Sequence, residues 1–246
     1  MSQLQASEIK MIRSLQEKKF RREYGMFVVE GEKMVEEALS SEFEVVKVYR
    51  RDEIGEQTMG RISSLKTAPP VLATVRTKKW PLEMPGKGKL YLGLDSVRDP
   101  GNLGTIIRLA DWFGVEAIFA SEDTVELYNP KTIQATMGAI FRKKLIYCNL
   151  KEVCSSFAKA GGKVYGTFLE GQDIYRESGF DAGGLVVMGN ESDGISKEVA
   201  EAVTDRITIP SFSPEGNGSE SLNVAIACAV TVSEFRRAMS RHNNAE

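Results

Sequence analysis

The amino-acid sequence predicts an α/β protein with a larger domain built on a parallel sheet and a smaller domain before it. Three observations lead to this fold class. The chain has 246 residues, of which 42% are hydrophobic, so it can bury a substantial core. After residue 88, short apolar segments alternate with amphipathic ones, as they do where helices cover both faces of a parallel sheet. Before residue 80, a shorter alternation predicts the second α/β domain.

The smaller domain is expected to span residues 1–80. Apolar residues at helical spacing predict its helices, and short runs rich in Val, Phe and Tyr predict its strands. The helices are predicted at 6–25, 32–40 and 56–65, and the strands at 26–31, 43–50 and 69–77. Residues 78–89 hold two prolines, two glycines and four lysines, which is typical of an exposed connection. A linker is therefore predicted at 81–88.

The larger domain is expected to span residues 89–246. Its strands are predicted at 89–95, 115–121, 144–148, 163–169, 183–190 and 205–211. Its helices are predicted at 104–114, 129–143, 150–162, 196–205 and 221–239. Open parallel sheets bind ligands beyond the carboxyl ends of their strands, so the loops that follow the strands are the candidate functional segments.

Charge and composition argue against several classes of protein. Lysines and arginines number 32 against 34 acidic residues, a net charge of −2, so uniform coating of a polyanion is not expected, although a local basic face is compatible with it. The first residues lack the apolar core of a signal peptide, and the longest apolar run is far shorter than a membrane span. Three cysteines without metal-ligand spacing are expected to be reduced and buried. A cytoplasmic protein without contact to a membrane is expected.

The histidine content narrows the chemistry further. The one histidine, His242, lies in the polar segment "RHNNAE". Ser-His-Asp and Cys-His mechanisms need an imidazole in the site, and a His-rich metal centre needs several. We therefore expect no metal, and chemistry based on Arg, Asp, Glu, Asn, Ser, backbone amides or a bound cofactor.

Three loops follow predicted strands of the larger domain. They read "RDPGNLG" (98–104), "MGNESDGIS" (188–196) and "IPSFSPEGNGSESLNVAIA" (209–227). A Gly-rich turn that leads into a helix presents free backbone N–H groups to an anion or a polar ligand, although a turn without a ligand would look the same. In the third loop, Ser221 is a candidate N-cap for a helix that is apolar almost all round.

The second loop resembles a dinucleotide-binding fingerprint only superficially. Gly189 and Gly194 have the required spacing, but Glu191 stands where the backbone must approach a pyrophosphate. A carboxylate there would repel phosphate. We therefore reject NAD binding by this loop. Glu191 could instead accept hydrogen bonds from backbone amides or orient a positive ligand group, and the alternative is a solvated turn with a helix cap near Ser192 or Ser196.

Together, "DSVRDPGNLGTIIRLADWFG", "VVMGNESDGIS" and "IPS…SLNVAIA" resemble the three motifs of the SpoU/TrmH family of S-adenosylmethionine-dependent RNA 2′-O-ribose methyltransferases, in the SPOUT class. "NPKTIQATMGAIFR" is similar to the helix that members carry between the first two motifs. "GMFVVEGEKMVEEAL" is similar to the start of their substrate-binding domain, which has a fold like that of ribosomal protein L30e. The resemblance implies a SPOUT-type sheet with a trefoil knot, S-adenosylmethionine as methyl donor, a tRNA or rRNA substrate, and a homodimer.

The resemblance also implies roles for particular residues. The catalytic residues would be Asn102, Arg108, Glu191, Ser221 and Asn223. The methyl donor would be held mainly by the backbone at Thr167, Leu169, Gly189, Ile209 and Leu222. The chain departs from the family in a longer segment between Ile209 and Ser221, and in Ala225 where a serine is common.

Among the residues implied to be catalytic, Arg108 can be given a defined role from its chemistry. A guanidinium stays protonated at any ordinary pH, which favours binding of a phosphate or of developing alkoxide charge over action as a general base. The sequence leaves both roles open.

A basic cluster in the first domain is the candidate RNA contact. Lys18, Lys19, Arg21 and Arg22 alternate with Phe20 and Tyr24, a combination that can bind phosphates and stack on bases, although a solvated helix face has the same pattern. The sequence thus predicts an RNA 2′-O-methyltransferase. The alternative is a catalytically inactive RNA-binding protein of the same fold, and a nucleotide-dependent oxidoreductase is disfavoured because the fingerprint is missing.

Overall fold

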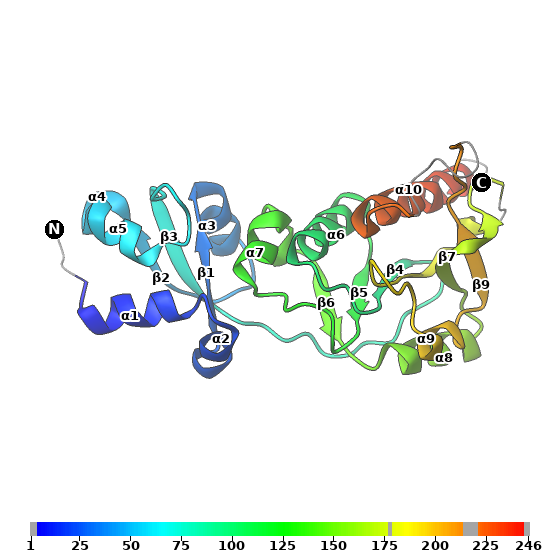
Figure 1. Ribbon diagram of the computed structural model, residues 1–246, viewed down its shortest axis with the longest axis horizontal. Coiled ribbons are helices and arrows are strands. Elements are labelled where there is room, and N and C mark those ends of the chain that lie inside the picture. Colours follow the sequence, from blue (N-terminus) through cyan, green and yellow to red (C-terminus); the bar gives the residue numbers. More distant parts are fainter. Residues whose placement is uncertain (1–3, 177–178, 214–220, 244–246) are drawn as a thin grey trace. The chain divides into compact units, whose positions relative to one another are not determined.

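The structure is a computed structural model that describes residues 4–176, 179–213 and 221–243. The chain forms two compact units (Figure 1). Unit 1 combines the chain up to Lys79 with Glu126–Arg142, and unit 2 combines Trp80–Val125 with the chain from Lys143 onward. The smaller unit is therefore built from two separate stretches of sequence.

Unit 1 contains an antiparallel three-stranded sheet with the order β1-β3-β2. Its strands are β1 (Met26–Glu30), β2 (Val45–Arg50) and β3 (Val71–Arg76). Its helices are α1 (Ala6–Ser14), α2 (Lys18–Tyr24), α3 (Glu32–Leu39), α4 (Arg51–Ile54), α5 (Glu56–Ile62), α7 (Pro130–Thr136) and the 3-10 turn η1 (Ala139–Phe141).

The helix predicted over residues 6–25 is interrupted. Helix α1 ends at Ser14 and α2 begins at Lys18. The turn between them directs the carbonyl groups of Leu15 and Gln16 at the guanidinium of Arg21, which donates to both at 2.8 and 2.7 Å. A continuous helix would use these carbonyls for its own hydrogen bonds. The break therefore creates a site for one arginine.

The second stretch of unit 1 completes its core. The ring of Phe27 in β1 is fully buried and stacks on Tyr128, with centroids 4.6 Å apart. Phe141 lies on the same aromatic cluster, 5.2 Å from Phe43. The sequence prediction places residues 129–143 in the larger domain as one helix. In the structure this segment is split at Met137, which has a left-handed backbone (φ 50°), and Glu126–Arg142 packs in unit 1 because its aromatic residues fill that core.

Unit 2 is a six-stranded sheet with the order β6-β5-β4-β8-β7-β9, and every strand pair in it is parallel. The strands are β4 (Leu90–Leu94), β5 (Ala117–Ala120), β6 (Lys144–Tyr147), β7 (Val164–Asp173), β8 (Gly184–Met188) and β9 (Asp205–Thr208). The helices are α6 (Pro100–Trp112), α8 (Leu150–Lys159), α9 (Lys197–Ala200), α10 (Val224–Asn243) and the 3-10 turn η2 (Phe180–Ala182). The predicted α/β fold with a parallel sheet is confirmed.

Helices cover both faces of this sheet (Figure 1). On one face, α8 and α9 bury residues such as Phe157 and Val199 against Tyr91 and Val187 of the strands. On the other face, α6 packs beside α10, and Phe235 of α10 stacks on Phe180 with centroids 4.1 Å apart. Aromatic pairs of this kind stabilise packing beyond the burial of apolar area, and this pair fixes α10 against η2. None of the helices in the described part of the chain combines the length and hydropathy needed to span a membrane.

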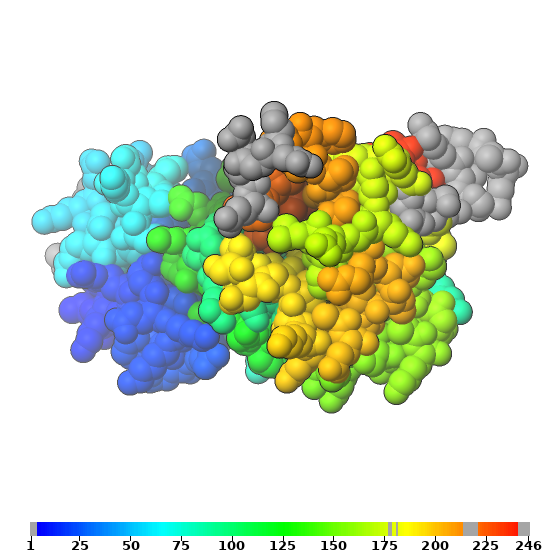
Figure 2. All heavy atoms as spheres, turned by 45° about the vertical axis from the view of Figure 1, so that its right-hand side comes forward, coloured from blue at the N-terminus to red at the C-terminus, as the bar shows by residue number. Residues whose placement is uncertain are grey.

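The strand order decides which loops meet. Strands β4 and β8 are paired at the centre, with Leu94 opposite Met188, so the loops that follow them emerge side by side. Strands β8, β7 and β9 are consecutive neighbours, and Figure 2 shows the orange β9 segment beside the yellow-green β7 segment. The register of β7 against β9 is interrupted between Thr167 and Gln172, which leaves residues 168–171 as a bulge.

Candidate active site

Helix α6 starts earlier than its sequence pattern predicts. Its N-cap is Asp99, whose Oδ1 accepts a hydrogen bond from the backbone N–H of Asn102 at 2.8 Å, and Pro100 occupies the first helical position. An aspartate cap and a proline in the first turn both favour a helix start. Asn102 therefore lies in the first turn of α6, at the positive end of the helix, instead of in a loop.

One chain of side-chain hydrogen bonds connects the three motifs. The amide nitrogen of Asn102 donates to Glu191 Oε1 at 2.8 Å, and its amide oxygen accepts from Asn223 Nδ2 at 2.9 Å. Asn102 is half-buried between its two partners, whereas Glu191 and Asn223 are exposed. The structure thus brings together three of the predicted catalytic residues, each from a different motif.

Asn223 has a second function in the same place. Its Oδ1 accepts from the backbone N–H groups of Ala225 and Ile226, at 2.9 and 3.3 Å, so Asn223 caps α10. The prediction that Ser221 is the N-cap is wrong, because the helix begins at Val224 and only Asn223 is adjacent to its free N–H groups. Ser221 is exposed just before this cap.

The loop that carries Glu191 is a tight turn. Asn190 and Gly194 exchange two backbone hydrogen bonds, at 2.9 and 3.1 Å. A side chain at Gly189 would collide with the backbone of Gly194, and Gly194 itself has a positive φ of 68°. Both glycines are therefore required by the geometry. Ser196 caps α9, as expected for this part of the chain.

Arg108 lies apart from these three residues. It is six positions after Asn102 in α6, which places it about 240° further round the helix. Its side chain is exposed, and no side chain within the described ranges pairs with its guanidinium. One turn later on the same side is Trp112, which is 84% exposed. This face of α6 thus presents a free positive charge and a large apolar surface.

The residues predicted to hold the methyl donor lie along one edge of the sheet. Thr167 is in β7, Gly189 follows β8 and Ile209 follows β9, and these strands are adjacent and parallel. Leu169 is in the β7 bulge, where its carbonyl accepts from Thr208 Oγ1 at 3.1 Å and its side chain is 78% exposed. Leu222, 51% exposed, precedes α10. Backbone groups beside uncovered apolar side chains can hold a nucleoside-like group.

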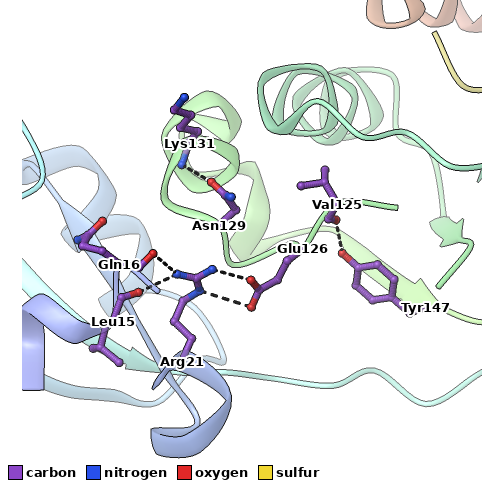
Figure 3. A network of polar contacts seen from close by, with 8 residues as sticks. All are labelled: Leu15, Gln16, Arg21, Val125, Glu126, Asn129, Lys131 and Tyr147. Atoms are coloured by element: carbon purple, nitrogen blue, oxygen red, sulfur yellow. Dashed lines mark hydrogen bonds and ion pairs between the residues drawn. The ribbon is translucent and has the colours of Figure 1, made fainter. Parts of the chain in front are cut away.

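The basic cluster of the first domain divides into two kinds of residue. Lys18, Lys19 and Arg22 are exposed on α2. Arg21 is 3% exposed and is surrounded by oxygen atoms (Figure 3). It forms an ion pair with Glu126 at 2.5 Å and donates to the carbonyls of the preceding turn. The prediction that Arg21 contacts RNA is wrong, because the side chain is buried and its guanidinium bonds to Glu126 and to two backbone carbonyls.

The cysteines take no part in the site. Burial raises the pKa of the Cys148 thiol to about 11 and those of Cys154 and Cys228 to about 12. A thiol with such a pKa remains protonated at neutral pH and is a poor nucleophile.

Sequence reasoning missed a polar network beside the site. Ser96, Ser121, Asp123 and Asn190 lie at the carboxyl ends of β4, β5 and β8. The signal was present, because these polar residues come within three positions of the ends of apolar parallel strands, whose carboxyl ends lie at the same edge of the sheet.

Known proteins share this architecture. The SpoU rRNA Methylase family matches residues 89–233, and the MRM3-like substrate binding domain matches residues 6–80. A 23S rRNA (guanosine(2553)-2′-O)-methyltransferase from Bacillus subtilis is 30% identical over 93% of this chain and 96% of its own length. The structure of an S-adenosylmethionine-bound rRNA methyltransferase from Sinorhizobium meliloti is 30% identical, with a TM-score of 0.85 over 96% of this chain and 97% of that one. A TrmH-family protein from Porphyromonas gingivalis is 36% identical, with a TM-score of 0.85 over 96% and 99% of the two chains.

A parallel sheet in which Asn102 of α6 and Glu191 of the loop after β8 are hydrogen-bonded, preceded by a substrate-binding domain, defines a SPOUT-class RNA methyltransferase that uses S-adenosylmethionine. The chain belongs to the SpoU rRNA methylase family. The predicted family, activity class and methyl donor are confirmed. The trefoil knot stays a prediction.

Proposed function

We propose that this chain methylates the 2′-hydroxyl of a ribose in ribosomal RNA. The observation that carries the proposal is the hydrogen-bonded chain Glu191–Asn102–Asn223, which assembles residues of all three motifs at one edge of the sheet. The likeness to a Bacillus subtilis 23S rRNA methyltransferase over nearly the full length of both chains supports rRNA as the substrate.

The carboxyl ends of β7, β8 and β9 offer features suited to S-adenosylmethionine. Gly189 packs directly on the backbone of Gly194, so the loop after β8 is compact at the position predicted to hold the donor. The β7 bulge turns Leu169 outward, and Leu169 and Leu222 offer uncovered apolar surface. When bound, the donor supplies an electrophilic methyl group on a sulfonium. Thr167, Leu169, Gly189, Ile209 and Leu222 would hold it through backbone groups and apolar contact.

Arg108 would act on the RNA. The ribose oxygen would gain negative charge as it loses its proton to water. Its lone pair would then form the bond to the methyl carbon while the carbon–sulfur bond breaks and leaves a neutral thioether. A guanidinium with no internal partner can bind this oxygen or the adjacent phosphate, which lowers the barrier by orientation and by electrostatic stabilisation. Asn102, held on both sides by Glu191 and Asn223, would provide a fixed polar group for the substrate at the carboxyl end of the sheet. Ser221, two residues before Asn223, would add a hydroxyl there.

RNA would also contact the exposed part of the basic cluster. Lys18, Lys19 and Arg22 extend into solvent, and the rings of Phe20 and Tyr24 stack on each other with centroids 6.4 Å apart. Cations next to an exposed aromatic ring can bind phosphates and stack on unpaired bases.

A homodimer is a further part of the proposal. The packed pair α6 and α10 leaves Trp112 84% and Ile226 53% exposed. Large apolar side chains on adjoining helices favour burial in an interface. A second copy would cover them and would place its own surface next to Arg108. Sedimentation should detect a dimer, and Trp112→Glu should convert it to a monomer.

Transfer of a labelled methyl group to deproteinised 23S rRNA tests the activity directly. Mass spectrometry of the product should locate the label on a ribose 2′-oxygen. Donor binding without any transfer to rRNA or tRNA would favour the alternative, an RNA-binding protein of the same fold that has lost the reaction. Label on tRNA alone would refute rRNA as the substrate.

A further inference from the structure

The turn between β4 and α6 contains a strained residue. Among the described residues that are not glycine, only Ser96 and Met137 have a positive φ, and Ser96 has a φ of 58°. A side chain disfavours this conformation, so it persists only where the surroundings fix it. Strain of this kind is frequent at functional sites.

Ser96 is held through all of its polar atoms. Its backbone N–H donates to Ser121 Oγ at 2.8 Å, and its hydroxyl donates to Asp123 Oδ2. Ser121 Oγ donates in turn to Asp123 Oδ1 at 2.7 Å. The carbonyl of Ser96 accepts from Asn190 Nδ2 at 2.7 Å. The carboxylate of Asp123 therefore anchors a turn that is itself bonded to the loop after β8.

Asn190 transmits this anchoring to Glu191, the next residue. While its Nδ2 holds Ser96, its Oδ1 accepts from the backbone N–H groups of Ser192 and Asp193, at 2.8 and 3.2 Å. Its backbone also pairs with Gly194. The turn that carries Glu191 is thus closed around the side chain of Asn190. Glu191 is exposed, so its position depends on the backbone beneath it.

We propose that Asp123, Ser96 and Asn190 are positioning residues that hold the Glu191 turn so that the carboxylate stays bonded to Asn102. This inference rests on the proposed function, because the position of Glu191 is taken to matter for ribose methylation. None of the three needs to touch the substrate. Small displacements of a reacting group are sufficient to lower a rate strongly, so a residue can act entirely through the position of another.

Substitution of Asp123 tests the proposal. Asp123→Ala should lower kcat for methyl transfer about tenfold, with KM for the donor and RNA affinity unchanged, because only geometry at Glu191 is lost. Asp123→Asn keeps one oxygen that can accept from Ser96 and should restore part of the rate. The matched control is Glu122→Ala, which removes the same charge from an exposed position one residue earlier. Equal kcat values for Asp123→Ala and Glu122→Ala would overturn the proposal.

A double-mutant cycle shows whether Asp123 acts through Glu191. In a Glu191→Gln background, Asp123→Ala should have little further effect on kcat, because the group that it positions is already impaired. If the fold reductions in kcat of the two single variants multiply in the double variant, Asp123 does not act through Glu191 and the proposal is refuted.

Hydrogen exchange gives a measurement that does not depend on activity. A peptide covering residues 189–196 should exchange faster in Asp123→Ala and in Asn190→Ala than in the wild type, and Glu122→Ala should leave it unchanged. An unchanged rate in Asp123→Ala would refute the positioning role. If the wild type transfers no methyl group to any RNA, the proposed function fails, and the exchange result still decides the role of Asp123.

Discussion

The surroundings of Arg21 in α2 and of Arg108 in α6 differ in how the positive charge is satisfied. Arg21 is buried, paired with Glu126 and bonded to two carbonyl groups of a turn. Arg108 is exposed, and the described residues provide it with no ionic partner. An arginine whose donors are all used inside the protein stabilises the fold, because its loss leaves other polar groups unpaired. An arginine with free donors remains available to an external anion.

The largest expected effect is on stability, at Arg21. Arg21→Ala would leave Glu126 partly buried without its partner and would free the carbonyls of Leu15 and Gln16. Loss of one partner of a buried ion pair costs about 3–5 kcal/mol of the free energy of unfolding. Chemical denaturation of Arg21→Ala measures this loss. The control is Arg22→Ala, which removes an exposed charge from the same helix and should change stability little. Equal stabilities of the two variants would refute the structural role.

The next effect is on the reaction, at Arg108. Arg108→Ala should reduce single-turnover methyl transfer by about 100- to 1000-fold, as is typical when a preorganised charged group is removed. Donor affinity and the melting temperature should stay near the wild type. Arg108→Lys should recover little, because lysine lacks the planar fork that binds two oxygens at once. Near-normal transfer by the alanine variant would show that Arg108 is not catalytic, and joint loss of stability and donor binding would make it structural, like Arg21.

A smaller effect is expected for the exposed part of the basic cluster. The triple variant of Lys18, Lys19 and Arg22 to Ala should bind RNA more weakly, and the slope of log affinity against log salt should fall by roughly 0.7–0.9 for each phosphate that is no longer bound. Titrations at several salt concentrations measure the slope. Lys33→Ala, an exposed cation on α3, should leave it unchanged. An unaltered slope in the triple variant would mean that these residues only form a solvated face.

The smallest effect concerns acid stability. Hydrogen bonds from Ser96 and then Ser121 hold the pKa of the Asp123 carboxyl below its ordinary value. A lowered pKa in the folded state contributes stability above the ordinary aspartate pKa of about 3.9, and this contribution disappears as the pH falls through the lowered value. Asp123→Asn should therefore show a flatter loss of stability below about pH 4 than the wild type. Parallel curves of melting temperature against pH would contradict this.

The sequence was sufficient for the parallel sheet, because buried strands and amphipathic helices carry their own periodicities. It also located Asn102, Glu191 and Asn223 through the resemblance of three loops to family motifs. It could not distinguish Arg21 from Arg22, because the residue that pairs with Arg21 lies 105 positions later in the chain. The cap of α10 was misplaced for a related reason, since Ser221 and Asn223 are both good caps and only the helix start distinguishes them.

The composition of unit 1 has a consequence for dissecting the protein. The stretch Glu126–Arg142 lies within the sequence of the methyltransferase domain, yet its Tyr128 and Phe141 are part of the core that also holds Phe27. A protease that cleaves only between residues 81 and 88 would leave two fragments that each hold part of one aromatic core. The nicked chain should then migrate as a single species in gel filtration. A substrate-binding module of this kind cannot be exchanged between enzymes at one junction. Residues 1–80 moved alone into another protein would lack Tyr128 and Phe141, which complete their aromatic core.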